Sequence, residues 1–209
     1  MRHIFFLLYF FCISTIASNE LKINNMPIEL IFNDGSSAKI SSCTDLQNQM
    51  SLGKKIESIP NISDPDYNDI KNKIFICRMQ NYISNHRMTR IKDSLSIHDV
   101  LSNFPATAAY FISQEEMDKV SREYSNKTIL EYTPDLIIDK NKAISQKKYT
   151  SYSLPEYYHF KNSDGDEIKI VILAGHSIGG TASSRSYWRI DDDHSHPWTV
   201  TELDENSFL

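Results

Sequence analysis

The chain has 209 residues and a formal net charge of -5. Hydrophobic residues make up 40% and charged residues 23%, which is enough apolar material for a core and excludes a disordered chain. The acidic balance argues against a nucleic-acid-binding surface, and six glycines and seven prolines exclude collagen-like and proline-rich linker architectures.

The N-terminus carries the pattern of a secretory signal peptide. Arg2 precedes an apolar run over residues 4–13, and small residues follow as far as Ala17. The run is too short to span a bilayer, which needs about 20 apolar residues. We therefore predict a signal peptide over residues 1–17, no transmembrane segment after its removal, and a periplasmic or extracellular protein. An uncleaved N-terminal anchor is the alternative.

Two cysteines remain after cleavage, because Cys12 leaves with the signal peptide. In an oxidising compartment, Cys43 and Cys77 are most simply one disulfide. A bridge that closes a loop of about 35 residues is worth roughly 3–4 kcal/mol in the chain-entropy model. Two buried free thiols are the alternative.

The first elements of the mature chain are a hairpin and a short helix. Residues 28–40 alternate in hydrophobicity around an Asn-Asp-Gly turn, which predicts a β-hairpin. Thr44 then resembles a helix cap, so we predict a helix over residues 45–52 that ends at Gly53.

The longest predicted helix begins at Asp64 and Pro65, which suit a cap and a first helical position, and runs to about His86. Its apolar residues recur at helical spacing, which predicts one buried stripe that includes Ile70, Ile74 and Cys77.

Shorter elements are predicted in the middle of the chain. Residues 96–103 suit a short helix, and residues 106–112 are compact and apolar and favour a strand. Ser113 and Glu116 have the spacing of a capping box, in which each side chain accepts from the other's backbone amide. That box predicts a helix that ends near Tyr124.

The remaining residues predict strands around a polar linker. Residues 128–132 and 136–139 are short strand candidates, and residues 140–154 are polar and favour a loop or linker. Beyond the linker, four strand-like segments alternate with turn signals, as in an antiparallel meander; they cover residues 157–160, 168–174, 184–190 and 198–203.

The predicted fold class is therefore α+β, with a helical N-terminal half that includes a short hairpin and a C-terminal antiparallel β-meander. We expect one α+β domain over residues 18–209. It consists of a helix-rich part over 18–139, the polar linker over 140–154 and a β-rich part over 155–209.

One motif has a catalytic pattern. Residues 175–179 read Gly-His-Ser-Ile-Gly after a hydrophobic strand candidate. This segment resembles the nucleophile elbow of the α/β-hydrolase family. The resemblance covers about 17 residues and implies that Ser177 attacks an ester or amide carbonyl while a histidine takes its proton.

Three departures from that family favour a different interpretation of Ser177. Only 32 residues follow Ser177, too few for the later strand–helix units that carry the acid and the histidine. The residues after the motif have weak helix propensity. The turn at residues 164–166 makes the preceding strand half of a hairpin. We therefore interpret Ser177 as an ordinary residue where a strand enters the Gly179-Gly180 turn.

A polar cluster at residues 191–196 could hold a metal ion. Asp192, His194 and His196 alternate, so an extended backbone would place them on one side, as zinc or copper ligands require. A solvated turn is the interpretation we favour, because no clear fourth ligand follows. Asn61 and Asn126 match the N-glycosylation pattern, which matters only in a eukaryotic source.

These features favour an exported, non-catalytic protein that binds another macromolecule, with a protein as the partner, and an inhibitor or immunity-type protein would fit. We expect no cofactor. The alternatives are a small secreted serine hydrolase that uses Ser177 and an exported metal-binding protein that uses Asp192, His194 and His196.

Overall fold

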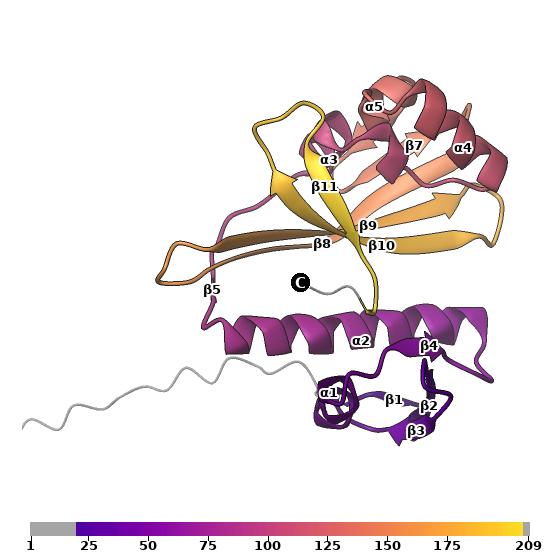
Figure 1. Cartoon of the computed structure of the whole chain (residues 1–209). Coiled ribbons are helices and arrows are strands. Elements are labelled where there is room, and N and C mark those ends of the chain that lie inside the picture. Colours follow the sequence, from indigo (N-terminus) through magenta and orange to yellow (C-terminus); the bar gives the residue numbers. More distant parts are fainter. Residues whose placement is uncertain (1–19, 207–209) are drawn as a thin grey trace, which may run out of the picture. The chain divides into compact units, whose positions relative to one another are not determined.

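A computed structural model describes residues 20–206 (Figure 1). The predicted signal peptide, residues 1–17, lies outside the described residues. The described chain divides into two compact units, with the boundary between Pro60 and Asn61.

The first unit is a small antiparallel sheet with one helix. Its elements are β1 Lys22–Ile23, β2 Met26–Phe32, β3 Ser37–Ile40, α1 Cys43–Ser51 and β4 Ile56–Ser58. Strand β2 pairs with β1, β3 and β4. The predicted hairpin is confirmed: Ile28 lies opposite Ile40, and Gly35 turns the chain with a φ of 77°. Only glycine adopts that conformation without strain.

Helix α1 begins two residues earlier than predicted. Its N-cap is Ser42, not Thr44, and the Ser42 hydroxyl accepts a hydrogen bond from the Asp45 amide. Ser42 has the extended backbone that a cap requires, whereas Thr44 already lies inside the helix. Gly53 follows the helix with a φ of 79°, as expected for a residue after a helix end.

The second unit contains the long helix and a larger sheet. Its helices are α2 Asp64–Asn85, α3 Ile97–Asn103, the 3-10 helix η1 Ala106–Ala108, α4 Gln114–Glu123 and α5 Ile129–Tyr132. Its strands are β5 Thr89–Arg90, β6 Ile137–Asp139, β7 Lys142–Ser145, β8 Thr150–Lys161, β9 Glu167–Ser177, β10 Ser183–Asp192 and β11 Thr199–Leu203.

The strands of the second unit form one antiparallel sheet. Its order is β11-β10-β9-β8-β7-β6, so neighbours in the sheet are also neighbours in the chain, and β5 pairs with β8. The predicted α+β class and the C-terminal meander are confirmed. Pairing runs along the whole β8–β9 hairpin, from Thr150 opposite Ser177 to Lys161 opposite Glu167.

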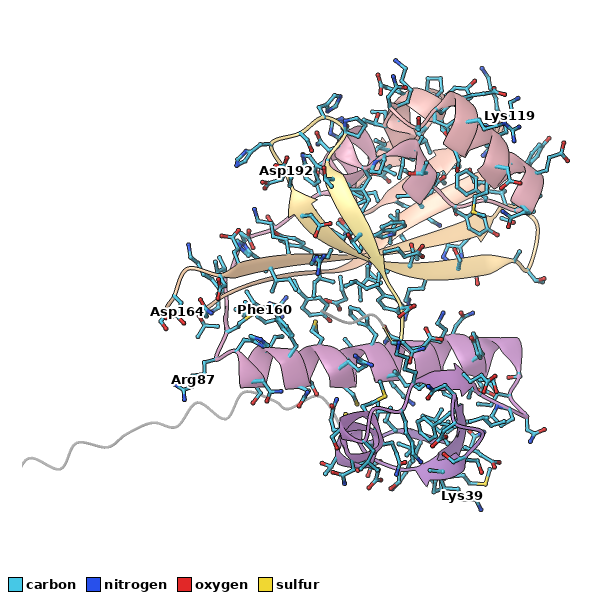
Figure 2. All side chains as sticks on the ribbon, in the orientation of Figure 1. Lys39, Arg87, Lys119, Phe160, Asp164 and Asp192 are labelled. Carbon is cyan, nitrogen blue, oxygen red and sulfur yellow. The ribbon has the colours of Figure 1, made fainter. Side chains whose placement is uncertain are left out.

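The sheet of the second unit is covered on both faces. Helix α2 lies along one face and the helices α3 to α5 cover the other (Figure 1). Strand β9 alternates between the two cores, as a period of two requires. Ile170 packs with Phe75 of α2 and with Phe160, which points toward α2 in Figure 2. Val171 and Leu173 pack on the α3 side.

Two segments that favoured strands are helical instead. Residues 106–112 contain η1 and then an irregular segment, and residues 128–132 form the cap and the single turn of α5. The strand prediction for both was wrong. In α5 the Thr128 hydroxyl accepts from the Glu131 amide, while the Glu131 carboxylate accepts from the Thr128 amide at 2.8 Å. This reciprocal cap stabilises a helical turn despite the β-branched residues.

Residues 140–154, predicted as a linker, instead contain β7 and the start of β8. At least one of their buried polar side chains finds a hydrogen-bond partner outside the segment. The Ser145 hydroxyl is buried and donates to the Asp135 carboxylate at 2.8 Å. Polarity along a strand therefore does not exclude burial when a partner lies within reach.

Helix boundaries depend on caps that the sequence identified in part. Helix α2 covers the predicted residues, but its N-cap is Ser63 and Asp64 is already helical. Helix α3 begins at Ile97, one residue after the predicted start, with Ser96 as its N-cap. In α4, the Ser113 hydroxyl accepts from the Glu116 amide, but the Glu116 carboxylate does not return the bond. It accepts from Tyr132 instead, so the predicted box is half formed.

Cys43 and Cys77 are disulfide-bonded, which confirms the predicted pairing. Among residues 20–206, no helix combines the length and the apolar character that crossing a membrane would require.

Candidate functional site

Ser177 is the last residue of β9, where the strand leaves the sheet for the turn to β10. Its hydroxyl lies 3.0 Å from the hydroxyl of Tyr110, and its backbone pairs with Thr150. The turn that follows uses Gly179 with a φ of 77°. Ser177 therefore occupies the strand end and glycine turn that the sequence predicted.

Gly175 is required because the Tyr110 side chain packs against it, and not because it belongs to a strained elbow. A Cβ atom at residue 175 would lie 2.3 Å from Cβ of Tyr110. The Tyr110 side chain thus packs directly on the β9 backbone, and the motif's first glycine makes room for it. The Tyr110 hydroxyl then reaches Ser177, two residues further along the same face.

Ser177 lies in a different setting from the serine of a nucleophile elbow. A strand and not a helix follows the turn. His176 points to the opposite face, where it lines a pocket with Asn68 and Asp69 of α2. Across the described chain, the hydroxyl of Tyr110 is the side-chain partner recorded for Ser177, and no imidazole or carboxylate is hydrogen-bonded to it.

Residues 191–196 comprise the last two residues of β10 and part of the hydrogen-bonded loop that leads to β11, where Figure 2 labels Asp192. The Asp192 carboxylate accepts from the backbone amide of His194 at 2.9 Å. The His194 side chain is 95% exposed, and the chain continues from His196 into a cis peptide bond with Pro197. In the part of the chain that the structure describes, no three His, Cys, Asp or Glu side chains are placed to hold a metal ion.

A charged network that the sequence did not reveal lies at the opposite end of the β8–β9 hairpin. The His159 ring is buried; its Nδ1 lies 2.7 Å from Oδ2 of Asp93, and its Nε2 lies 2.8 Å from Oε1 of Glu167 without hydrogen-bond alignment. Lys169 continues the network to Glu167 and to Asp193, at 3.1 and 2.7 Å.

The direction of the pKa shifts in this network follows from its ion pairs. The hydrogen bond from Lys169 lowers the pKa of the Glu167 carboxyl and that of the Asp193 carboxyl. The same bond to Asp193 raises the pKa of Lys169. These charges tie the loop after β10 to the hairpin, which is a structural role.

A second polar cluster joins α4 to the turn between β7 and β8. The Tyr132 hydroxyl donates to Glu116 at 2.6 Å, and Lys148 Nζ lies 2.6 Å from the Tyr132 hydroxyl and 3.2 Å from the Glu116 carboxylate. Burial, and then the bond to Glu116, raise the pKa of Tyr132. This cluster fixes the β7–β8 turn against α4, although its members are far apart in the sequence.

Three exposed apolar side chains lie on the turn before β8, on the segment after Tyr110 and on α4. Tyr149 is 64% exposed and adjoins the Ser177 turn, because its carbonyl accepts from the Ile178 amide at 2.7 Å. Ile112 is 57% exposed and follows the segment that carries Tyr110, and Met117 of α4 is 38% exposed. We call the surface formed by residues 110–117, 148–149 and 177–186 the Ser177 end.

A cleft of about 250 Å³ opens at the Ser177 end. Its apolar wall includes Phe111, Met117 and Trp188, and its polar wall includes Ser184 and Glu202. An aromatic and apolar cleft with a few polar groups on its rim is typical of a surface that receives side chains of a ligand.

Comparison with protein-family models, with curated proteins and with solved structures found no match for this chain.

Proposed function

We propose that this protein is exported and binds another protein through the Ser177 end. The observation that carries the proposal is the cleft lined by Phe111, Met117 and Trp188. Ile112, next to Phe111 in the chain, and Tyr149, whose carbonyl is hydrogen-bonded to the turn after β9, are exposed apolar side chains on neighbouring segments. Exposed apolar side chains that gather on a soluble surface mark an interaction site more often than scattered ones do. Tyrosine and methionine are also enriched in the centres of protein interfaces.

Export is the second part of the proposal, and three features support it. The sequence begins with a signal-peptide pattern. The Cys43–Cys77 disulfide persists in oxidising compartments and is rare in the cytosol. Asn61 and Asn126, the two glycosylation candidates, are exposed. N-terminal sequencing of the native protein should show a start near residue 18, and an intact Met1 in a cytosolic fraction would contradict export.

Alanine substitutions test the binding surface directly. The purified native exported fraction is passed over immobilised protein, and the bound partner is compared among variants. Tyr149→Ala and Ile112→Ala should each reduce retention of the partner about tenfold, because a central interface side chain contributes about 1–2 kcal/mol. Leu52→Ala is the matched control, because Leu52 is 72% exposed but belongs to the first unit. Equal retention by all variants would contradict the assignment of the surface.

An inhibitor or immunity-type role is the finer form of this proposal. It requires that the partner is an enzyme and that binding at the Ser177 end blocks it. Once a partner is captured, its activity is measured with the wild-type protein and with Tyr149→Ala. Inhibition by the wild type that is lost in the variant would support the finer form.

A further inference from the structure

We infer that the Ser177 end binds an extended segment of its partner as an added strand beside β10. This inference rests on the proposed function and specifies how the partner is held. It starts from the register of the sheet: β10 pairs with β9 from Ser183 to Ile190, but with β11 only from Tyr187 onward. Among the strands that the structure describes, the first four residues of β10 therefore have a neighbour on one side only.

The backbone groups of this open stretch can be assigned to sides. The Ser177 amide donates to the Ala182 carbonyl at 3.0 Å, so the backbone groups of residue 182 face β9. In an antiparallel strand, the amide and the carbonyl of one residue point to one side of the strand, and those of the next residue point to the other side. The backbone amides and carbonyls of Ser184 and Ser186 therefore also face β9. Those of Ser183 and Arg185 point to the open side of β10.

These outward groups lie on an accessible edge. Residues 183–185 are exposed, and no described residue makes a recorded hydrogen bond to the backbone amide or carbonyl of Ser183 or Arg185. An unpaired edge of this kind is a template for another strand. After β11, the described residues run toward α2: Arg78 of α2 donates to the Glu205 carbonyl at 2.8 Å, and Lys71 pairs with the Glu205 carboxylate at 3.5 Å.

The cleft specifies the chemistry of the added segment. A strand added beside residues 183–186 would continue in the position that β11 occupies in the sheet as far as Leu203. Its side chains would alternate between the two faces of the sheet. On the α4 face they would enter the cleft against Phe111, Met117 and Trp188. The fitting partner is therefore an extended segment with an apolar or aromatic side chain at the position that faces the cleft.

Hydrogen exchange on the intact, disulfide-bonded protein tests this mode of binding. The probe is a synthetic linear nonapeptide, obtained by selecting a displayed random library against the protein. The amides of Ser183 and Arg185 should exchange at least tenfold more slowly with the peptide, because each gains a backbone hydrogen bond. Protection of other amides only, failure to select any peptide, or a dimer formed through this edge would overturn the inference.

Paired substitutions separate the contribution of the backbone amide to peptide binding from that of the side chain. Arg185→Pro removes the outward amide, whereas Arg185→Ala keeps it, so only the proline variant should weaken peptide binding about tenfold. Ser183→Pro against Ser183→Ala repeats the comparison at the first residue of the strand, where proline disturbs folding least. Equal affinities in both pairs would overturn strand addition. If the native partner is lost with Tyr149→Ala but retained by both proline variants, the binding surface stands and strand addition fails.

Discussion

The contact between Tyr110 and Gly175 can be tested by adding one methyl group. In Gly175→Ala the new Cβ would lie 2.3 Å from Cβ and 2.5 Å from Cγ of Tyr110, well inside the carbon contact distance of about 3.5–4.0 Å. Tyr110 would have to move, and its hydroxyl would leave Ser177, which it now meets at 3.0 Å.

The expected loss of stability follows from three contributions. Overpacking costs about 1–3 kcal/mol, and the lost hydrogen bond costs about 1 kcal/mol. Alanine regains about 0.4–1 kcal/mol because it restricts the unfolded chain more than glycine does. We therefore expect Gly175→Ala to lower the free energy of unfolding of the second unit by about 1–3 kcal/mol.

Urea unfolding followed by tryptophan fluorescence measures this change, because both tryptophans, Trp188 and Trp198, belong to the second unit. Gly180→Ala is the control: its new Cβ would meet Ser177 Cβ at 3.2 Å, a tight contact that a shift of a few tenths of an ångström relieves, so we expect a loss below about 1 kcal/mol. The double variant Tyr110→Ala with Gly175→Ala should cost less than the two single losses together, by at least about 0.5 kcal/mol. A Gly175→Ala variant as stable as the wild type, or additive losses, would refute the reasoning.

Three further predictions concern the disulfide, the charged network and Ser177. Reduction of the Cys43–Cys77 bridge should lower the free energy of unfolding by roughly 3–4 kcal/mol, and a titration that finds two free thiols in the denatured, unreduced protein would contradict the bridge. The Asp193 carboxyl has a pKa below its ordinary 3.8 because of its bond to Lys169, so its stabilising effect is present above about pH 4 and is lost as the pH falls through the folded-state pKa. Lys169→Met should reduce the loss of the free energy of unfolding at low pH, measured by urea unfolding. An unchanged pH profile would contradict this role of the Lys169–Asp193 pair. A fluorophosphonate probe should leave Ser177 unlabelled, and Ser177→Ala should cost within about 1 kcal/mol; stoichiometric labelling at Ser177 would instead support the hydrolase alternative.

Local patterns predicted the elements that depend on near neighbours. The hairpin over residues 28–40, the helix α2, the second half of β8 and the strands β9 to β11 follow from periodicity and turn residues within a few positions. The wrong predictions concern segments whose structure depends on contacts with residues distant in the sequence. Residues 140–154 are polar, yet Ser145 is buried because Asp135 accepts its hydroxyl proton.

The candidate site was predicted less completely than the fold. The sequence placed Ser177 at a strand end before a glycine turn, and the structure does the same. It carried no signal for Tyr110, which is 67 positions away, or for the pairing of His159 with Asp93, because only the folded sheet brings these residues together. The open edge of β10 also depends on where β11 ends, which local propensity does not determine.

Photo-crosslinking from the Ser177 end tests the central claim, protein binding at this surface, most directly. A photoreactive phenylalanine analogue replaces Tyr149 in one variant and Asp164 in another; Asp164 is exposed and lies at the far tip of the β8–β9 hairpin (Figure 2). Both variants are irradiated in the native exported fraction. We expect a discrete covalent adduct with one partner protein from position 149 and none from position 164. An adduct from position 164 alone, or equal adducts from both positions, would contradict binding at the Ser177 end.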